Sequence, residues 1–357
     1  MNASRRADAV RQRPGPPLAV TMGEPAGIGG ELSLRAWQGR HDADLPCFLV
    51  IDDPGRLQRL SRSLDLGVAV VPIEAPGEAL EVFGRGLPVL ALGDPVTAEP
   101  GRPSPATAAA VLESISLATR LTLGGETAAV VTNPIHKKVL LDAGFEHPGH
   151  TEFLAELCGS PGKAVMMLAT PGLRTVPVTI HQPLAEVPAS LTGALILETA
   201  RTTVRGLQQQ FGIAHPRLAV AGLNPHAGED GKLGTEDGLV IAPAVASLQA
   251  EGIDVFGPVA ADSLFHPAAR RGYDAALCMY HDQALIPVKT LDFEHGVNVT
   301  LGLPIVRTSP DHGTALDIAG KGLASPVSLL AAIALAGTLA ANKQTGGTQG
   351  TTVYDHV

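Results

Sequence analysis

Three histidines stand where short apolar segments of the chain end. His181 follows residues 176–180, His226 comes shortly after residues 218–221, and His281 follows residues 275–279. If these segments are parallel strands, their carboxyl ends meet at the edge of a sheet where open α/β folds bind ligands. Converging neutral imidazoles would hold a divalent cation there. The alternative is that each imidazole is hydrogen-bonded separately, since the intervals are too long for a local metal signature.

A second set of residues suits a phosphate group. Residues 148–152 read Pro-Gly-His-Thr-Glu and begin a segment with helical periodicity, so free N–H groups and the Thr151 hydroxyl would face an anion beside His150. An ordinary helix cap that involves Glu152 explains the same residues equally well. Further along, Lys289 and Arg307 lie among apolar neighbours, where a bound anion would offset the cost of an unpaired cation.

The glycine-rich segment Gly23–Gly30 follows a short apolar segment but is no dinucleotide fingerprint. It lacks the spacing GxGxxG, and no Gly-Lys-Ser/Thr follows that would make it a P-loop. A nicotinamide site, if present, must therefore be of another kind.

The elements that must position these residues alternate in type. Short apolar runs predict strands, and helix-period segments lie between them, an alternation typical of a largely parallel α/β sheet. The predicted strands lie at 18–21, 47–51, 68–71, 128–131, 164–168, 176–180, 218–221 and 275–279, and the predicted helices at 104–122, 191–211, 236–250 and 326–341.

Length and composition narrow the class of protein. A chain of 357 residues is long enough for two α/β lobes, and a net charge of −9 argues against nucleic acid or an anionic membrane as partner. The three cysteines are far apart and form no CxxC pair, which indicates a reducing cytoplasm. Residues 1–17 predict a disordered leader rather than a transit peptide, and residues 342–357 predict a flexible tail.

Several long motifs resemble those of the 4-hydroxythreonine-4-phosphate dehydrogenase family, and the resemblance runs from about Leu18 to Ala341. The motifs are Gly23-Glu24-Pro25-Ala26-Gly27-Ile28-Gly29, residues 148–152, Gly222-Leu223-Asn224-Pro225-His226-Ala227-Gly228-Glu229, Tyr280-His281-Asp282-Gln283 and Gly296-Val297-Asn298-Val299-Thr300-Leu301-Gly302. Gly30 departs from the family, which usually has Pro there. The resemblance implies an isopropylmalate-dehydrogenase-like fold of two α/β lobes with the active-site cleft between them. We expect residues 18–133 and 290–341 to form the lobe on the cofactor side. Residues 134–289 would form the lobe for metal, substrate and dimerisation.

The resemblance also implies roles for single residues. It makes His181, His226 and His281 the ligands of a divalent metal, Zn²⁺, Co²⁺ or Mg²⁺, and implies a homodimer whose active sites are shared between subunits. The residues that it implies for the phosphorylated substrate are His150, Thr151, Lys289, Asn298 and Arg307.

A cofactor loop is implied by a wider resemblance. Residues 311–322 are similar to the loop with which isopropylmalate dehydrogenases hold the adenosine of NAD. The candidate contacts to NAD or NADP are His312, Gly313, Thr314 and Asp317. Ser325 departs from that pattern, because those enzymes carry Asn there.

The reaction that the resemblance implies belongs to pyridoxal phosphate biosynthesis. It is oxidation of 4-phosphooxy-L-threonine at its C3 hydroxyl, followed by decarboxylation to 3-amino-2-oxopropyl phosphate. Asp282 or Asp262 would accept the hydroxyl proton or orient a ligand histidine, and Lys289 would also stabilise developing negative charge. Two alternatives remain: a dehydrogenase of a related acid such as D-threonate 4-phosphate, and a phosphate acyltransferase of similar architecture.

Overall fold

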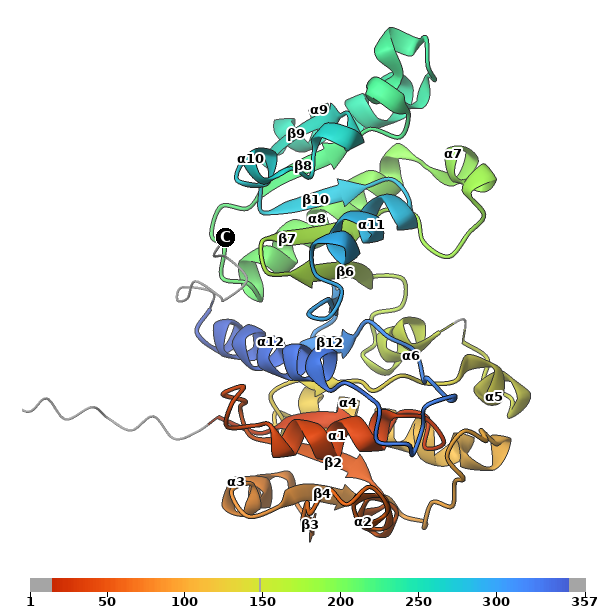
Figure 1. The fold of residues 1–357 in the computed structure, drawn as a ribbon. Helices are drawn as coiled ribbons and strands as arrows, with labels where there is room; N and C mark the ends of the chain where they lie inside the picture. Colours follow the sequence, from red (N-terminus) through yellow and green to blue (C-terminus); the bar gives the residue numbers. More distant parts are fainter. Residues whose placement is uncertain (1–14, 148, 347–357) are drawn as a thin grey trace, which may run out of the picture.

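One twelve-stranded sheet runs through the computed structural model, which describes residues 15–147 and 149–346 (Figure 1). In sheet order, the strands are β3 (Val70–Ile73), β4 (Leu87–Ala91), β2 (Phe48–Asp52), β1 (Leu18–Thr21), β5 (Val130–Val131), β12 (Arg307–Pro310), β11 (Val297–Leu301), β6 (Val165–Thr170), β7 (Leu173–Pro177), β10 (Ala275–Cys278), β8 (Arg217–Ala221) and β9 (Asp254–Val259).

The sheet consists of two parallel blocks joined by antiparallel pairs. Strands from β3 to β12 run parallel to one another, as do those from β7 to β9, whereas β11 and β6 are antiparallel to their neighbours. The two blocks therefore run in opposite directions within the sheet. Sheets twist by about 20° per strand, so over the roughly seven strands between the block centres the rotation reaches about 140°. The twist largely offsets the reversal, and the carboxyl ends of both blocks face the same side.

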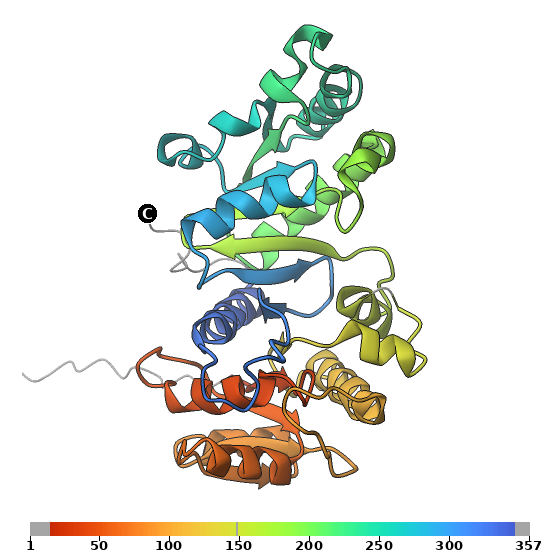
Figure 2. The same ribbon diagram turned by 45° about the vertical axis from the view of Figure 1, so that its right-hand side comes forward.

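The views agree with this geometry. Figure 1 places α5 and α6, which follow the carboxyl end of β5, on the same side as α7, which follows that of β7. Figure 2 shows the molecule as elongated, with the N-terminal strands at one end and residues 217–278 at the other.

Helices cover both faces of the sheet, which explains why its strands are apolar on both sides. Successive residues alternate between two cores: Leu18 and Val20 face one, and Ala19 faces the other. The α-helices are α1 (Gly29–Gln38), α2 (Pro54–Ser63), α3 (Ala79–Val82), α4 (Ala108–Leu123), α5 (Lys137–Asp142), α6 (His150–Leu157), α7 (Val187–Ser190), α8 (Gly193–Gln209), α9 (Ala242–Ala250), α10 (Pro267–Arg270), α11 (His281–Leu291) and α12 (Val327–Gln344). The shorter helical elements are η1 (Pro76–Glu78), η2 (Pro105–Thr107), η3 (Leu184–Glu186), η4 (Pro225–Gly231), η5 (Asp237–Ile241) and η6 (Ala261–Ser263).

Helix α12 is long and apolar enough to cross a membrane by length and composition alone. Packing accounts for its composition, because Leu329, Ile333, Leu335 and Leu339 are buried in the core beside β12 and α1.

The α/β class is confirmed, while the proposed lobe boundaries stay a prediction. The tail prediction was wrong at its start, since α12 continues to Gln344 and the buried Asn342 side chain donates a hydrogen bond to the Gln210 carbonyl. The rest of the predicted leader and tail, residues 1–14 and 347–357, lies outside the described residues.

Four strands went unpredicted, each for a chemical reason. The sequences of β11 and β12, VNVTL and RTSP, contain too many polar residues to stand out as apolar runs. Strand β9 begins with Asp and contains Gly257 and Pro258, and β4 contains Pro88. Pairing with neighbouring strands stabilises these four segments as strands. The local sequence pattern does not reveal this pairing.

Candidate active site

His181 and His281 lie next to each other because their strands do. Strand β7 pairs with β10 in a register that places Pro177 opposite Cys278. The backbone continues this pairing past the strands: Val178 donates to the Cys278 carbonyl (2.7 Å), and the Thr179 hydroxyl donates to the Met279 carbonyl (2.7 Å). Two residues later in each chain segment, the imidazole rings face each other with centroids 5.8 Å apart.

Each of these histidines is held differently. His181 has a positive φ of 44°, a left-handed conformation that is uncommon for a residue other than glycine. His281 begins α11, and its Nδ1 lies 2.7 Å from the Asp282 carboxylate. That contact leaves the Nε2 atom of His281 for another partner, as in a metal ligand oriented by a carboxylate.

His226 lies in η4, a segment with left-handed backbone at residues 226–230. Such a run costs conformational energy and must be held in place by its surroundings. The buried Asp237 carboxylate holds it, accepting hydrogen bonds from the backbone N–H groups of Leu223 (2.8 Å) and Asn224 (3.1 Å). Gln283 ties this loop to α11, since its side chain donates to the Gly222 carbonyl (2.7 Å) and accepts from the Met279 N–H (2.6 Å).

The three predicted metal ligands do not all meet in one chain. Within residues 15–147 and 149–346, no three His, Cys, Asp or Glu side chains gather closely enough to hold a metal ion. The His181–His281 pair supplies two imidazoles of the kind that Zn²⁺ or Co²⁺ binds, so its chemistry fits a divalent ion. Two imidazoles alone do not complete the set of protein ligands that such an ion needs.

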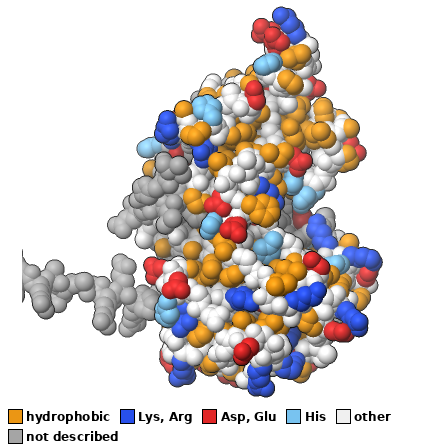
Figure 3. All heavy atoms as spheres, viewed as in Figure 1, with side chains coloured by type: hydrophobic (Ala, Val, Ile, Leu, Met, Phe, Trp, Pro, Cys, Tyr) orange, Lys and Arg blue, Asp and Glu red, His pale blue; other side chains and the backbone are white. Residues whose placement is uncertain are grey.

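A cavity of about 420 Å³ opens beside the pair and is lined by His181, His281, Asp282, Tyr280 and Leu184. A second cavity of about 360 Å³ continues along α11 past His281 and Asp282 to Lys289. Figure 3 shows histidine, acidic and basic side chains together near the middle of the molecule.

Arg307 is the most deeply buried cation among the predicted site residues, at 4% exposure. Its guanidinium donates to two hydroxyl groups: Nη2 and Nε to Thr132 (2.7 and 3.2 Å), and Nη1 to Thr300 (2.9 Å). Burial lowers the pKa of Arg307 to about 10, and the charge of Glu152 opposes this shift. Hydroxyl partners fix the guanidinium in place without neutralising it, which leaves a positive site for an anion.

Asn298 faces the same side of the sheet as Arg307. Asn298 stands opposite Ser309 on β12, and paired residues have their side chains on the same face of the sheet. Side chains two residues apart also share a face, so Arg307 lies on the face of Ser309, and Thr300 lies on the face of Asn298.

Helix α6 brings His150 and Thr151 to this region. Its N-cap is Gly149, which has no side chain to cap the helix, and the cap role considered for Glu152 stays a prediction. The Nε2 atom of His150 is buried without a hydrogen-bond partner among the described residues. Burial, and then the charge of Arg307, hold the pKa of His150 well below its ordinary value, which favours the neutral imidazole.

The histidine pair and the phosphate residues share one electrostatic neighbourhood. Burial lowers the pKa of His181, followed by the charges of Lys137 and His281, while Glu152 raises it. The charge of Glu152 also acts on Arg307, so the two regions are close enough to interact electrostatically.

The predicted cofactor residues lie in the loop after β12. Thr314 accepts a hydrogen bond from the Ile28 N–H (3.1 Å), which joins this loop to the glycine-rich segment. Gly313 and Asp317 are exposed, and His312 bonds the Gly313 carbonyl through Nδ1 (3.0 Å). The Nε2 atom of His312 is buried with no described partner. Burial lowers the pKa of this histidine.

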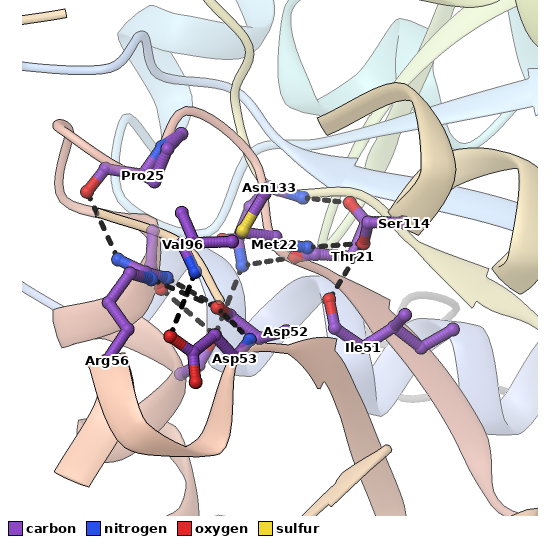
Figure 4. A network of polar contacts seen from close by, with 12 residues as sticks. Thr21, Met22, Pro25, Ile51, Asp52, Asp53, Arg56, Val96, Ser114 and Asn133 are labelled. Atoms are coloured by element: carbon purple, nitrogen blue, oxygen red, sulfur yellow. Dashed lines mark hydrogen bonds and ion pairs between the residues drawn. The ribbon is translucent and has the colours of Figure 1, made fainter. Parts of the chain in front are cut away.

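Hydrogen bonds from neighbouring elements hold the glycine-rich segment and the end of β1 before it in place (Figure 4). Arg56 and Asp52 form a buried ion pair, and Arg56 Nη1 donates to the Pro25 carbonyl (3.1 Å). The Ser114 hydroxyl accepts from the Met22 N–H (2.9 Å) and donates to the Ile51 carbonyl (2.8 Å). Asn133 reaches across from the next strand to the Thr21 carbonyl (2.9 Å).

Comparison with known proteins agrees with the motifs. The profile of the family described as "Pyridoxal phosphate biosynthetic protein PdxA" matches residues 44–336. The 4-hydroxythreonine-4-phosphate dehydrogenase of Bradyrhizobium diazoefficiens is 52% identical over 337 residues, which cover 92% of this chain and 98% of the relative. A 4-hydroxythreonine-4-phosphate dehydrogenase of Methylorubrum extorquens is 56% identical over 330 residues, covering 91% of this chain and 94% of the relative. The chain belongs to the PdxA family.

The solved structure of the Klebsiella pneumoniae 4-hydroxythreonine-4-phosphate dehydrogenase superposes with a TM-score of 0.81 at 37% identity, covering 91% of this chain and 99% of that one. Membership in the PdxA family makes the protein an enzyme, an oxidoreductase. At Gly30, where the sequence departs from the family, an added Cβ would lie 3.0 Å from Leu60 Cδ2 and 3.1 Å from the Arg56 guanidinium nitrogens, so a larger residue would need these side chains to shift.

Two predicted residues have surroundings that the sequence did not reveal. Lys289 was expected to be an unpaired cation, but it forms an ion pair with Asp311 (2.8 Å) at the start of the cofactor loop. Asp262 is exposed in η6, which contacts η4, the element that contains His226, rather than lying beside the His181–His281 pair.

The sequence interpretation missed several residues of this PdxA-family site. Lys137 was detectable, since it follows closely on the strand-terminating Asn133-Pro134. Thr132 and Thr300, the hydroxyl partners of Arg307, gave no signal, because threonine is common in strands. Asp237 gave none either, as its role depends on a turn that begins fourteen residues earlier.

Proposed function

We propose that the protein oxidises 4-phosphooxy-L-threonine at its C3 hydroxyl with NAD or NADP, in the cytoplasm, as a step of pyridoxal phosphate biosynthesis. The 3-keto acid that results loses CO₂ to give 3-amino-2-oxopropyl phosphate. The curated relatives at 52% and 56% identity have this substrate in their names.

The single observation that supports this function best is the buried Arg307 guanidinium beside His150. It is a cation with hydroxyl partners only, next to a neutral imidazole whose Nε2 atom has no described partner. A phosphate monoester satisfies both groups, with the free N–H groups at the start of α6 and the Thr151 hydroxyl as further donors. Asn298, on the same face as Arg307, would donate to the substrate.

The chain's own residues then position the reacting carbon. With the phosphate held at Arg307, the C3 hydroxyl extends toward the His181–His281 pair. Asp282 either accepts the hydroxyl proton or keeps His281 in the orientation that exposes Nε2; the 2.7 Å contact supports the second role. Lys289 stabilises negative charge that develops as the C1–C2 bond breaks, and Asp311 fixes its position.

His181 and His281 would hold a divalent cation, and His312, Gly313, Thr314 and Asp317 would hold the nicotinamide cofactor. Bound there, the cation supplies positive charge for the C3 oxygen and the nicotinamide accepts the hydride. The buried, unpartnered Nε2 of His312 supports a ligand at the cofactor loop.

We further propose that the protein acts as a homodimer and that His226 of the partner subunit completes the metal site. Two observations support this: His226 does not join the other histidines within the described chain, and apolar side chains beside the pair are exposed. Leu184 and Ile286, which line the two cavities, are 65% and 63% exposed, as expected for a surface that a second subunit covers.

The test is NADH or NADPH formation from 4-phosphooxy-L-threonine, before and after chelation, with Zn²⁺, Co²⁺ or Mg²⁺ added back. We expect turnover that chelation abolishes and a divalent ion restores. Turnover only with D-threonate 4-phosphate would show that the proposed substrate is wrong and that the proposed reaction class is right. Failure with both acids and both cofactors, under every metal, would overturn the proposal and favour a phosphate acyltransferase.

A further inference from the structure

Four arginines surround a cavity of about 530 Å³ at the edge of the sheet opposite the histidines. They are Arg174 at the start of β7, Arg217 at the start of β8, and Arg270 and Arg271 at the end of α10, just before β10. The carboxyl ends of these three strands lead to His181, His226 and His281, so the cavity lies at the amino ends of the same strands. Figure 1 shows α10 on one side of these strands and α7 on the other.

The arginines are fixed in place by the protein. Arg174 is buried, donates to the Asp274 carbonyl (3.2 Å), and has its guanidinium 4.9 Å from the centre of the Phe211 ring. Arg217 binds the Asp274 carboxylate through two nitrogens (3.2 and 3.0 Å) and the Arg271 carbonyl through the third (3.1 Å). Positions held in this way are preorganised for a ligand.

The charge of the lining is unbalanced. Among the described residues that line the cavity, Asp274 is the only carboxylate, and Arg217 already occupies both of its oxygens, so Arg270 and Arg271 are left without a described carboxylate. Arg270 donates through Nη1 to the Gly172 carbonyl (3.3 Å), but its Nε atom is buried without a partner among the described residues. The Arg271 side chain is exposed, and no described carboxylate pairs with it.

We propose that this cavity is a binding site for a small phosphorylated molecule, separate from the active site. Planar guanidinium groups match the oxygens of phosphate in pairs, and several that converge favour phosphate over a monocarboxylate. The cavity is larger than inorganic phosphate needs and falls in the size range of small-ligand sites. Leu173, Ile213 and Tyr273 give it an apolar wall for the organic part of the ligand.

The experiment is titration calorimetry of the full chain with inorganic pyrophosphate at physiological ionic strength. Because Arg307 offers a second phosphate site, the wild-type protein and an Arg307→Met variant are compared. We expect pyrophosphate binding to persist in Arg307→Met and to weaken at least about tenfold in Arg271→Gln. Arg271→Gln removes an exposed side chain, so it should fold normally and keep its dehydrogenase activity.

The matched control is Arg85→Gln, an exposed arginine at the far end of the sheet that carries the same change of charge. Pyrophosphate affinity equal to wild type in that variant would support a local site. Equal weakening in both variants would overturn the proposal in favour of non-specific charge attraction. Full loss of binding in Arg307→Met alone would also overturn it, because all binding would then belong to the active site.

Discussion

The phosphate region and the histidine region of the proposed active site are built in opposite ways. Arg307 is buried and fixed by two threonine hydroxyls from β11 and from the end of β5, all within one chain. The histidines lie at an open edge: His281 and Asp282 side chains are 37% and 70% exposed, and His226 is on a separate loop. The difference supports the proposal that the phosphate site is preorganised within the subunit, whereas the histidine site would be completed by what binds there.

The largest effect is expected from Arg307→Met. Loss of two or more charge-assisted contacts to the phosphate should lower kcat/KM for 4-phosphooxy-L-threonine by about 10³-fold or more. The free energy of unfolding should stay the same or rise, since a desolvated charge without a carboxylate partner is removed. Steady-state kinetics and urea unfolding measure the two effects.

The control for that variant is Arg102→Met, which removes an arginine that is 77% exposed and paired with Glu99. It should change neither quantity appreciably, since exposed ion pairs contribute about 1 kcal/mol or less. If Arg307→Met unfolded the protein while keeping full activity per folded molecule, Arg307 would be a structural residue and the comparison would fail.

A smaller effect should follow from Asp237→Asn, which weakens the support of the His226 loop. The carboxylate accepts hydrogen bonds from Leu223 and Asn224, so its loss lets the left-handed segment relax. We expect Co²⁺ affinity to fall by about 10- to 100-fold, as for other residues that orient metal ligands. Visible absorption of bound Co²⁺ measures this.

Glu236→Gln is the matched control, because Glu236 touches the same loop only through the Asn224 side chain (2.8 Å). Its Co²⁺ affinity should stay within a few-fold of wild type. An unchanged affinity in Asp237→Asn would show that His226 needs no preorganised loop.

The smallest effect is on the pH dependence of stability. His150 has a depressed pKa in the folded protein, so below about pH 6.5 the unfolded chain binds a proton that the folded chain does not. Stability should therefore fall as pH decreases through this value, by at most about 1.4 kcal/mol per pH unit for this one group. His150→Asn should reduce the slope between pH 7.5 and pH 5.5 in denaturant titrations.

Bound substrate should reduce the loss of stability at low pH, because a phosphate dianion raises the pKa of the adjacent His150 imidazole. An identical slope in wild type and His150→Asn would mean that His181 and His312, whose pKa values burial also lowers, account for the whole acid sensitivity.

The sequence predicted the fold class and the grouping of polar residues at the ends of strands, because periodicity and strand-terminal position are local properties. It predicted that Arg307 lies among apolar residues, and the guanidinium is indeed buried. It could not reveal the partners of that guanidinium, since Thr132 and Thr300 meet it only through the pairing of β5, β12 and β11. The same limit hid the Lys289–Asp311 pair and the left-handed conformation of His226.

The most direct test of the central claim, a phosphate site within one chain and a metal site shared between two, is subunit mixing. His181→Ala and His226→Ala, each inactive alone, are refolded together in equal amounts, and mixed dimers are verified by two affinity tags. One of the two sites in each mixed dimer would then hold all three histidines, so activity should recover to about a quarter of wild type. His181→Ala mixed with His281→Ala should stay inactive, because both histidines belong to the same side of the site. No recovery in the first mixture, with mixed dimers present, would contradict the claim and place His226 in the site of its own chain.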